Sequence, residues 1–252
     1  MKKISIFILL TSLTIILQAD LPKGEKLRSE KCYEEGLIPD KYVDKSDAAG
    51  YTALMNAVSS GDSALVQKLI DCGANVKKAN SYTGQTPLMF ATEKNYPKIV
   101  NLLIDNGANI NFRDKEGGTA LLNAALTQNF ALVRLLIEKG ADINQANKKG
   151  ETPLMFAAAR NLEIARYLIE KGADTNAADS EGFTPLMIAT LEDKPKVVTL
   201  LLDKGANPSL VNKKGKTALD LTSIRINRWT KVERPGIARL LENYIEKEKI
   251  SS

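Results

Sequence analysis

The sequence predicts an all-α solenoid of about six stacked helix–turn–helix units, joined by short hairpin-like turns. The first observation is the motif G-x-T-x-L, whose glycine recurs at nearly constant intervals at Gly50, Gly84, Gly117, Gly150, Gly182 and Gly215. The second is a Gly-Ala pair in the same phase, beginning at Gly73, Gly107, Gly140, Gly172 and Gly205. A period of about 33 residues is typical of solenoids, in which neighbouring units stack because one unit cannot bury its apolar face alone.

The residues within one period predict a pair of helices. Thr152 is suited to cap a helix N-terminus, and Pro153 is suited to the first helical position, where no N–H donor is needed. Residues 132–137 form a second helix with a broad apolar face at helical spacing. Gly140 suits the left-handed conformation that ends such a helix, and the polar residues 147–150 predict the turn into the next unit.

Three units carry the most distinctive stretch, which reads Thr-Pro-Leu-Met-Phe-Ala at 86–91 and 152–157 and Thr-Pro-Leu-Met-Ile-Ala at 184–189. These stretches resemble the T-P-L-H-x-A start of the repeat of the ankyrin family, whose period is the same. The resemblance covers about residues 47–245, and the chain looks like a small exported bacterial ankyrin repeat protein. The units implied by the resemblance span about 47–80, 81–113, 114–146, 147–178, 179–211 and 212–245, and a short tail follows at 246–252.

The sequence departs from the family at the position of the motif histidine, which is occupied by Met55, Met89, Leu122, Met155, Met187 and Asp220. A column of methionines has two interpretations. It is a reducible oxidation sink or a track for a soft metal, or it fills space in the core, and we favour the second. The loss of histidine removes the hydrogen bond that this residue makes in the family. The fourth unit is also one residue short around residues 160–162.

Residues 1–19 predict a secretory signal peptide. A basic start at Lys2 and Lys3 precedes an uncharged apolar run at 4–17, and the small residue Ala19 marks the expected cleavage site. At about 1.5 Å per residue the run is about 21 Å long, shorter than the ~30 Å hydrocarbon core of a membrane. We therefore expect export to a bacterial periplasm or beyond the cell; the alternative is an uncleaved membrane anchor.

Residues 20–46 carry no repeat motif and are expected to form an N-terminal extension that covers the first unit. This extension contains Cys32, and Cys72 stands at the end of the first unit's second helix. An exported chain favours a disulfide between them. Spacing alone leaves the pairing open.

Composition excludes several classes of enzyme. The chain has no histidine and two cysteines, so it lacks the residues for a Ser-His-Asp triad, a His-ligated metal or an iron–sulfur cluster. We expect no catalysis and no cofactor. The alternative hypothesis is that the chain is an enzyme that uses the turn carboxylates Glu116, Glu151 and Glu181. Acidic residues that lie one repeat apart do not converge on one substrate.

The charge distribution argues against a nucleic-acid partner. The net charge is +5, yet residues 212–252 alone hold ten Lys or Arg against five acids, so no uniform basic surface is expected. About seven residues are inserted into the last unit within 225–235, and they include the only Trp. Arg228, Trp229 and Lys231 are a candidate second site for a membrane or an envelope polymer. The alternative is that Trp229 packs on the last helix.

The resemblance implies a non-catalytic module that binds another protein through its turn tips and first-helix surface. We expect a monomer that helps or inhibits a periplasmic enzyme; the alternative is a secreted factor acting on host proteins. The aromatic residues Tyr51, Tyr82 and Phe183 are the expected anchors. The remaining candidates, taken by register, are Gln85, Lys94, Lys115, Glu116, Lys148, Lys149, Glu151, Arg160, Ser180, Glu181, Lys213, Lys214 and Lys216.

Overall fold

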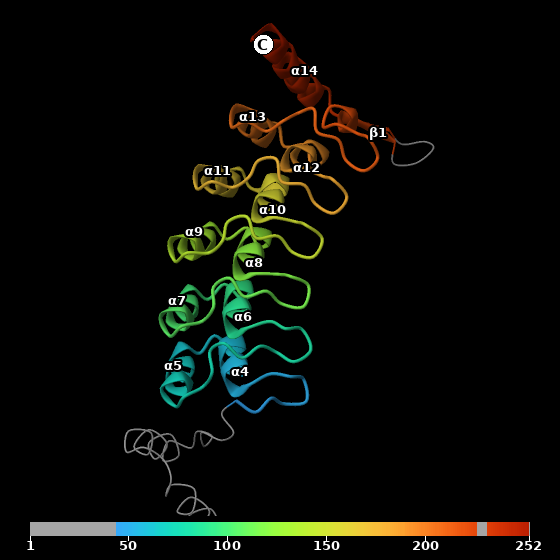
Figure 1. Cartoon of the computed structure of the whole chain (residues 1–252). Coiled ribbons are helices and arrows are strands. Elements are labelled where there is room, and N and C mark those ends of the chain that lie inside the picture. Colours follow the sequence, from blue (N-terminus) through green and yellow to red (C-terminus); the bar gives the residue numbers. More distant parts are fainter. Residues whose placement is uncertain (1–43, 226–230, 252) are drawn as a thin grey trace, which may run out of the picture.

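The computed structural model describes residues 44–225 and 231–251, which form a row of stacked helix pairs (Figure 1). Five complete pairs follow one another along the chain. Their bounds are α4 Ala53–Ser60 and α5 Ser63–Asp71, α6 Pro87–Glu93 and α7 Pro97–Asp105, α8 Ala120–Leu126 and α9 Phe130–Glu138, α10 Pro153–Arg160 and α11 Leu162–Glu170, and α12 Pro185–Leu191 and α13 Pro195–Asp203. The predicted solenoid of helical units is confirmed.

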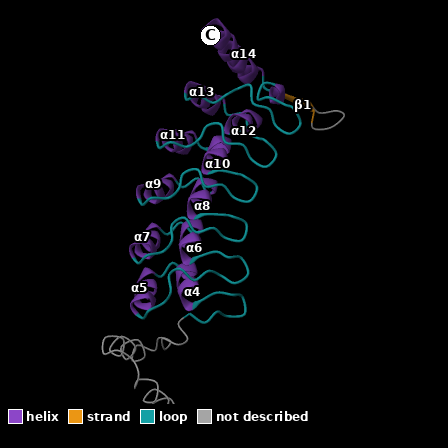
Figure 2. Cartoon of the chain, viewed as in Figure 1, coloured by secondary structure: helices purple, strands orange, loops and turns teal. Residues whose placement is uncertain are grey.

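The helices lie in two parallel rows (Figure 2). The first helices of the units, α4 to α12, form one row, and the second helices, α5 to α13, form the other. The long turns between units project beyond the first-helix row, on the side away from the second helices. Fully buried alanines on the first helices, such as Ala91, Ala124 and Ala157, let successive helices approach closely.

Threonine begins each first helix, as the sequence predicts. In all five complete units its hydroxyl oxygen accepts the backbone N–H three residues later, at 3.2–3.4 Å. Proline follows the threonine in three units, at Pro87, Pro153 and Pro185. The threonine and proline together fix where each first helix starts.

The methionines at the histidine position are core residues. Met55, Met89, Met155 and Met187 are at most 2% exposed, in agreement with the packing interpretation. In the first three of these, Sδ accepts the backbone N–H of the capping threonine at 3.5 Å. The thioether therefore supplies an acceptor at the place where the loss of histidine was expected to remove a hydrogen bond.

The link between the two helices of a unit contains one residue with positive φ. This residue is Gly61, Asn95, Gln128 or Asp193, with φ between 52° and 76°. The fourth unit omits it: Asn161 ends α10 and also caps α11, where its side chain accepts the N–H of Ile164 at 3.1 Å. The residue missing from the sequence of this unit is thus the left-handed one.

Asparagines join successive units near the ends of the second helices. The side-chain oxygens of Asn111, Asn144 and Asn176 accept a backbone N–H from the following unit at 2.7–2.9 Å. Their amide groups donate to the carbonyl of that unit's Gly-Ala glycine at 3.1–3.3 Å. Each asparagine therefore sets the position of one unit on the next.

The sixth unit differs from the others. Its first helix is a single 3-10 turn, η1 Asp220–Thr222, after which strands β1 Ser223–Arg225 and β2 Lys231–Glu233 pair antiparallel before α14 Pro235–Ser251. The insertion expected within 225–235 thus includes most of a two-stranded hairpin, an addition to the predicted all-helical fold. The Arg234 guanidinium donates to the carbonyls of Leu191 (2.7 Å) and Leu221 (3.3 Å).

Asp220, at the histidine position of the sixth unit, makes a charged version of the same cap. Its carboxylate accepts the backbone N–H of Thr217 at 2.8 Å and the Thr217 hydroxyl at 2.9 Å. These two hydrogen bonds, the backbone one first, lower the pKa of Asp220 below its ordinary value of 3.8. The carboxylate is therefore the favoured form in the folded protein.

The thioether caps are tested by a matched pair of substitutions. Met155→Leu removes an Sδ acceptor, whereas Met187→Leu removes a sulfur that, in the described part of the chain, accepts no hydrogen bond, and both side chains are at most 2% exposed. We expect Met155→Leu to lower the free energy of unfolding by about 0.5–1 kcal/mol more than Met187→Leu. Urea denaturation measures both, and equal losses would show that the sulfur contact contributes nothing.

The cap at Asp220 makes a pH-dependent contribution. A carboxylate whose pKa is lowered on folding stabilises the protein above its unfolded pKa, and this contribution is lost as the pH falls through the folded pKa, below 3.8. We expect Asp220→Asn to melt at a lower temperature than the wild type at pH 7, and this difference to shrink at pH 3. Melting curves at both pH values measure it. A difference independent of pH would contradict this assignment.

Candidate functional site

An Asp or Asn side chain shapes each turn tip. Asp47, Asp114, Asn147, Asp179 and Asn212 each accept two backbone N–H groups, from the residues two and four positions later, at 2.7–3.1 Å. Sequence reasoning missed these residues. The signal was available, since each stands three residues before a motif glycine.

Backbone hydrogen bonds join the tips into one continuous strip, which we call the tip row (residues 81–83, 115–116, 148–149, 180–181 and 213–214). The N–H groups of Lys115, Lys148, Ser180 and Lys213 donate to carbonyls of the preceding tip at 2.7–3.1 Å. At Gly84, which has a φ of +78°, a Cβ would lie 2.8 Å from the Lys115 nitrogen. Glycine is therefore required for tips to approach this closely.

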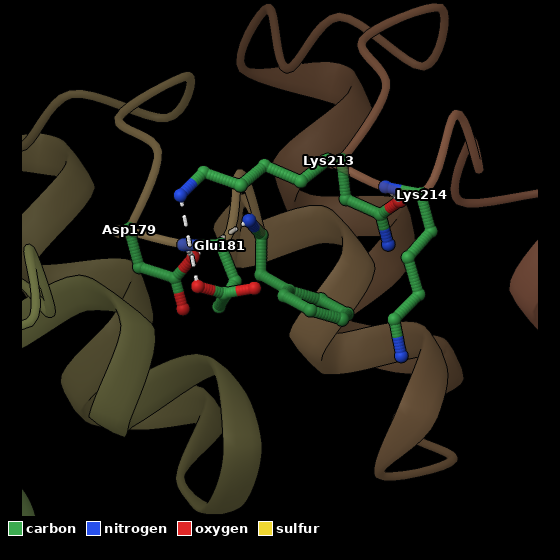
Figure 3. Close-up of polar contacts among 6 residues, drawn as sticks. Asp179, Glu181, Lys213 and Lys214 are labelled. Carbon is green, nitrogen blue, oxygen red and sulfur yellow. Dashed lines mark hydrogen bonds and ion pairs between the residues drawn. The ribbon is translucent and has the colours of Figure 1, made fainter.

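The side chains of the tip row extend into solvent. Figure 3 shows the last two tips, where the Lys213 ammonium lies 3.7 Å from the Glu181 carboxylate. The two side chains are 66% and 62% exposed, so their ion pair contributes little to stability. These charges remain accessible to a partner.

The structure places most of the predicted site residues on the surface. The exposed ones are Tyr82, Lys94, Lys115, Glu116, Lys148, Lys149, Arg160, Ser180, Glu181, Lys213, Lys214 and Lys216. Tyr51, Gln85, Glu151 and Phe183 are half-buried. The Tyr51 ring lies 5.3 Å from the Phe90 ring, and Phe183 packs against the core. Two of the three expected aromatic anchors are thus partly used in packing.

Tyr82 is the most exposed large apolar side chain of the described residues, at 67%. The second turn has one residue more than the others between its Asx residue, Asn80, and its glycine, Gly84. Asn80 still closes the turn, accepting the N–H groups of Tyr82 and Thr83 at 2.9 and 3.0 Å. The longer turn places the Tyr82 ring against the first tip. A Cβ added to Gly50 would lie only 2.9 Å from Cδ2 of this ring.

Sequence reasoning missed Leu126, the last residue of α8, which is 45% exposed. At the same register position the other complete units have Ser59, Glu93, Ala159 and Leu191, and Leu191 is half-buried, so aligning the units locates the position but not its exposure. The half-buried Phe156 belongs to the same row of first helices. We call the exposed and half-buried side chains of this row the first-helix surface; its large apolar residues are the exposed Leu126 and the half-buried Phe156, Ile188 and Leu191.

The remaining predicted residues are only partly described. Cys32, Arg228 and Trp229 lie outside the described residues. Lys231 lies in β2, and Cys72 is buried just after α5. The disulfide and the second site therefore stay predictions.

Neither a metal centre nor a membrane span is found in the described ranges. Within residues 44–225 and 231–251, no three His, Cys, Asp or Glu side chains form a group able to hold a metal ion. The helices described there are too short or too polar to cross a bilayer.

Comparison with known proteins agrees with this architecture. The family described as Ankyrin repeats (3 copies) matches residues 34–114, 106–179 and 121–212, which together make up more than half of the chain. No curated protein matches the sequence. The chain belongs to the ankyrin repeat family, whose members generally serve as non-catalytic scaffolds that bind other proteins.

Proposed function

We propose that this chain is an exported, non-catalytic module that binds one partner protein across its tip row and first-helix surface, and so helps or inhibits a periplasmic enzyme. The observation that carries the proposal is the tip row, in which exposed side chains extend from a backbone bonded from unit to unit. Such a surface is long and open, suited to another protein rather than to a small molecule, which needs a concave pocket.

The rigidity of the tips favours binding. Loops that order only on association lose conformational entropy at that moment. Here the tips are already fixed by Asx side chains such as Asn147 and by cross-unit bonds such as that from Lys148 N–H to the Glu116 carbonyl, 2.9 Å. A partner therefore meets a preformed surface.

Two side chains are the strongest candidates for anchors. Tyr82 and Leu126 are 67% and 45% exposed, and they lie on the tip row and on the first-helix surface respectively. Aromatic side chains contribute disproportionately to binding energy at interfaces. The surrounding charges, among them Lys115 and Glu116, favour specificity and the rate of association more than affinity.

Export is the part of the proposal that rests on the sequence alone. It is supported by the basic start and the apolar run of residues 1–19, which lie outside the described residues. If the chain is exported, its partner is a protein of the periplasm or of the cell's surroundings.

The proposal is tested by capture of a partner with surface variants. Immobilised wild type, Tyr82→Ala, Leu126→Ala and the double variant are incubated with a periplasmic fraction, and bound proteins are identified by mass spectrometry. We expect the double variant to lose one specific protein, with each single variant at least about tenfold weaker, the loss of about 1.4 kcal/mol of binding free energy.

Arg166→Ala is the matched control, because Arg166 is an exposed residue of α11, in the opposite row of helices. It should retain the partner, and all variants should keep the melting temperature of the wild type. Retention of the partner by the double variant would reject the tip row and first-helix surface as the binding site. If Arg166→Ala lost the partner to the same extent, this assignment of the binding site would also be rejected.

A further inference from the structure

The described chain begins with a contact that belongs to the repeat pattern. The Asp44 carboxylate accepts the N–H of Asn75 at 2.9 Å, 31 residues later, just as Asn111 accepts the N–H of Asp142 at 2.8 Å, also 31 residues later. The Lys78 ammonium donates to the Asp44 carbonyl. Asp44 thus occupies the place that an asparagine of a preceding unit would take.

The end face of the first unit is apolar but less buried than the equivalent faces within the array. Leu65 on α5 is half-buried, whereas Ile99, Leu132 and Ile164, at the same register position, are at most 1% exposed. Terminal units of solenoids need a cover for such a face.

Cys72 lies at this end of the molecule. It follows α5, three residues before Asn75, and its side chain is 4% exposed. No free thiol is found among residues 44–225 and 231–251, and the only other cysteine of the chain is Cys32. The segment from Cys32 to Asp44 spans up to about 40 Å when fully extended, so Cys32 is within reach of Cys72.

We propose that residues 20–43 cover the outer face of α4 and α5 and that a disulfide between Cys32 and Cys72 fixes them there. The bond forms by thiol–disulfide exchange. The two thiols lose two protons and pass two electrons to an oxidised small disulfide, such as glutathione disulfide, which is reduced to two thiols. This inference does not depend on the proposed partner binding.

The disulfide closes the part of the chain that runs from Cys32 to Cys72 into a loop. A cross-link of this kind restricts the unfolded chain and therefore stabilises the N-terminal units. We expect its reduction to lower their melting temperature by about 5 °C or more.

The test uses the full purified chain, equilibrated either with glutathione disulfide or with a reductant. After denaturation, we expect the oxidised monomer to contain no free thiol and the reduced one to contain two. Limited proteolysis should cut residues 20–43 much faster in the reduced chain. The Cys32→Ser variant, kept oxidised, should match the reduced wild type in both melting temperature and cleavage rate.

Three results would overturn the inference. Two reactive thiols after oxidation would exclude the disulfide, and a bond that joins two chains would exclude its assignment within one chain. A correct disulfide with unchanged cleavage of residues 20–43 would exclude the cover. We use Cys32→Ser rather than Cys72→Ser because Cys72 is buried, and its substitution would disturb folding by itself.

Discussion

The stacking of one unit's apolar face on the next is the interaction on which the whole structure depends. Val133 and Leu136 of α9 and Ala157 of α10 are completely buried, although each belongs to a unit of only two short helices. Helices this short are marginal in isolation, so the threonine caps and glycines select where helices start and stop but do not hold the fold alone. Burial between units supplies that stability, and the array gains cooperativity from it.

Polar contacts between units fix how neighbouring units are placed relative to one another. Asn144 joins the ends of second helices, and the backbone bond from Lys148 to Glu116 joins the tips, so neighbouring units are held at two separated points. Their register is then fixed on both sides of the first-helix row. The surface we assign to binding is a direct consequence, because exposed side chains on ordered tips exist only where stacking has already brought the backbones together.

Much of this fold could be predicted, because its determinants are local and recur. The period, the caps at residues such as Thr152 and the left-handed glycines all follow from residue types at fixed spacing. The pairing of β1 with β2 could not be predicted, because counting residues reveals an insertion but not the conformation it adopts. The sulfur acceptor of Met155 was missed because a thioether is a weak acceptor, although the contact with Thr152 is local. For the site, register located the tips but could not separate the exposed Tyr82 from the half-buried Phe183, a difference made by one extra turn residue and by packing.

If the tips form a preordered strip before any partner binds, amide hydrogen exchange of the free chain should show it. The N–H groups of Lys115, Lys148, Ser180 and Lys213 lie on surface turns, yet each donates to a carbonyl of the neighbouring tip. We therefore expect these four amides to exchange slowly, at rates approaching those of amides in the buried helices. Exchange at the rate of an unstructured chain would show instead that the tips are not ordered in the free chain.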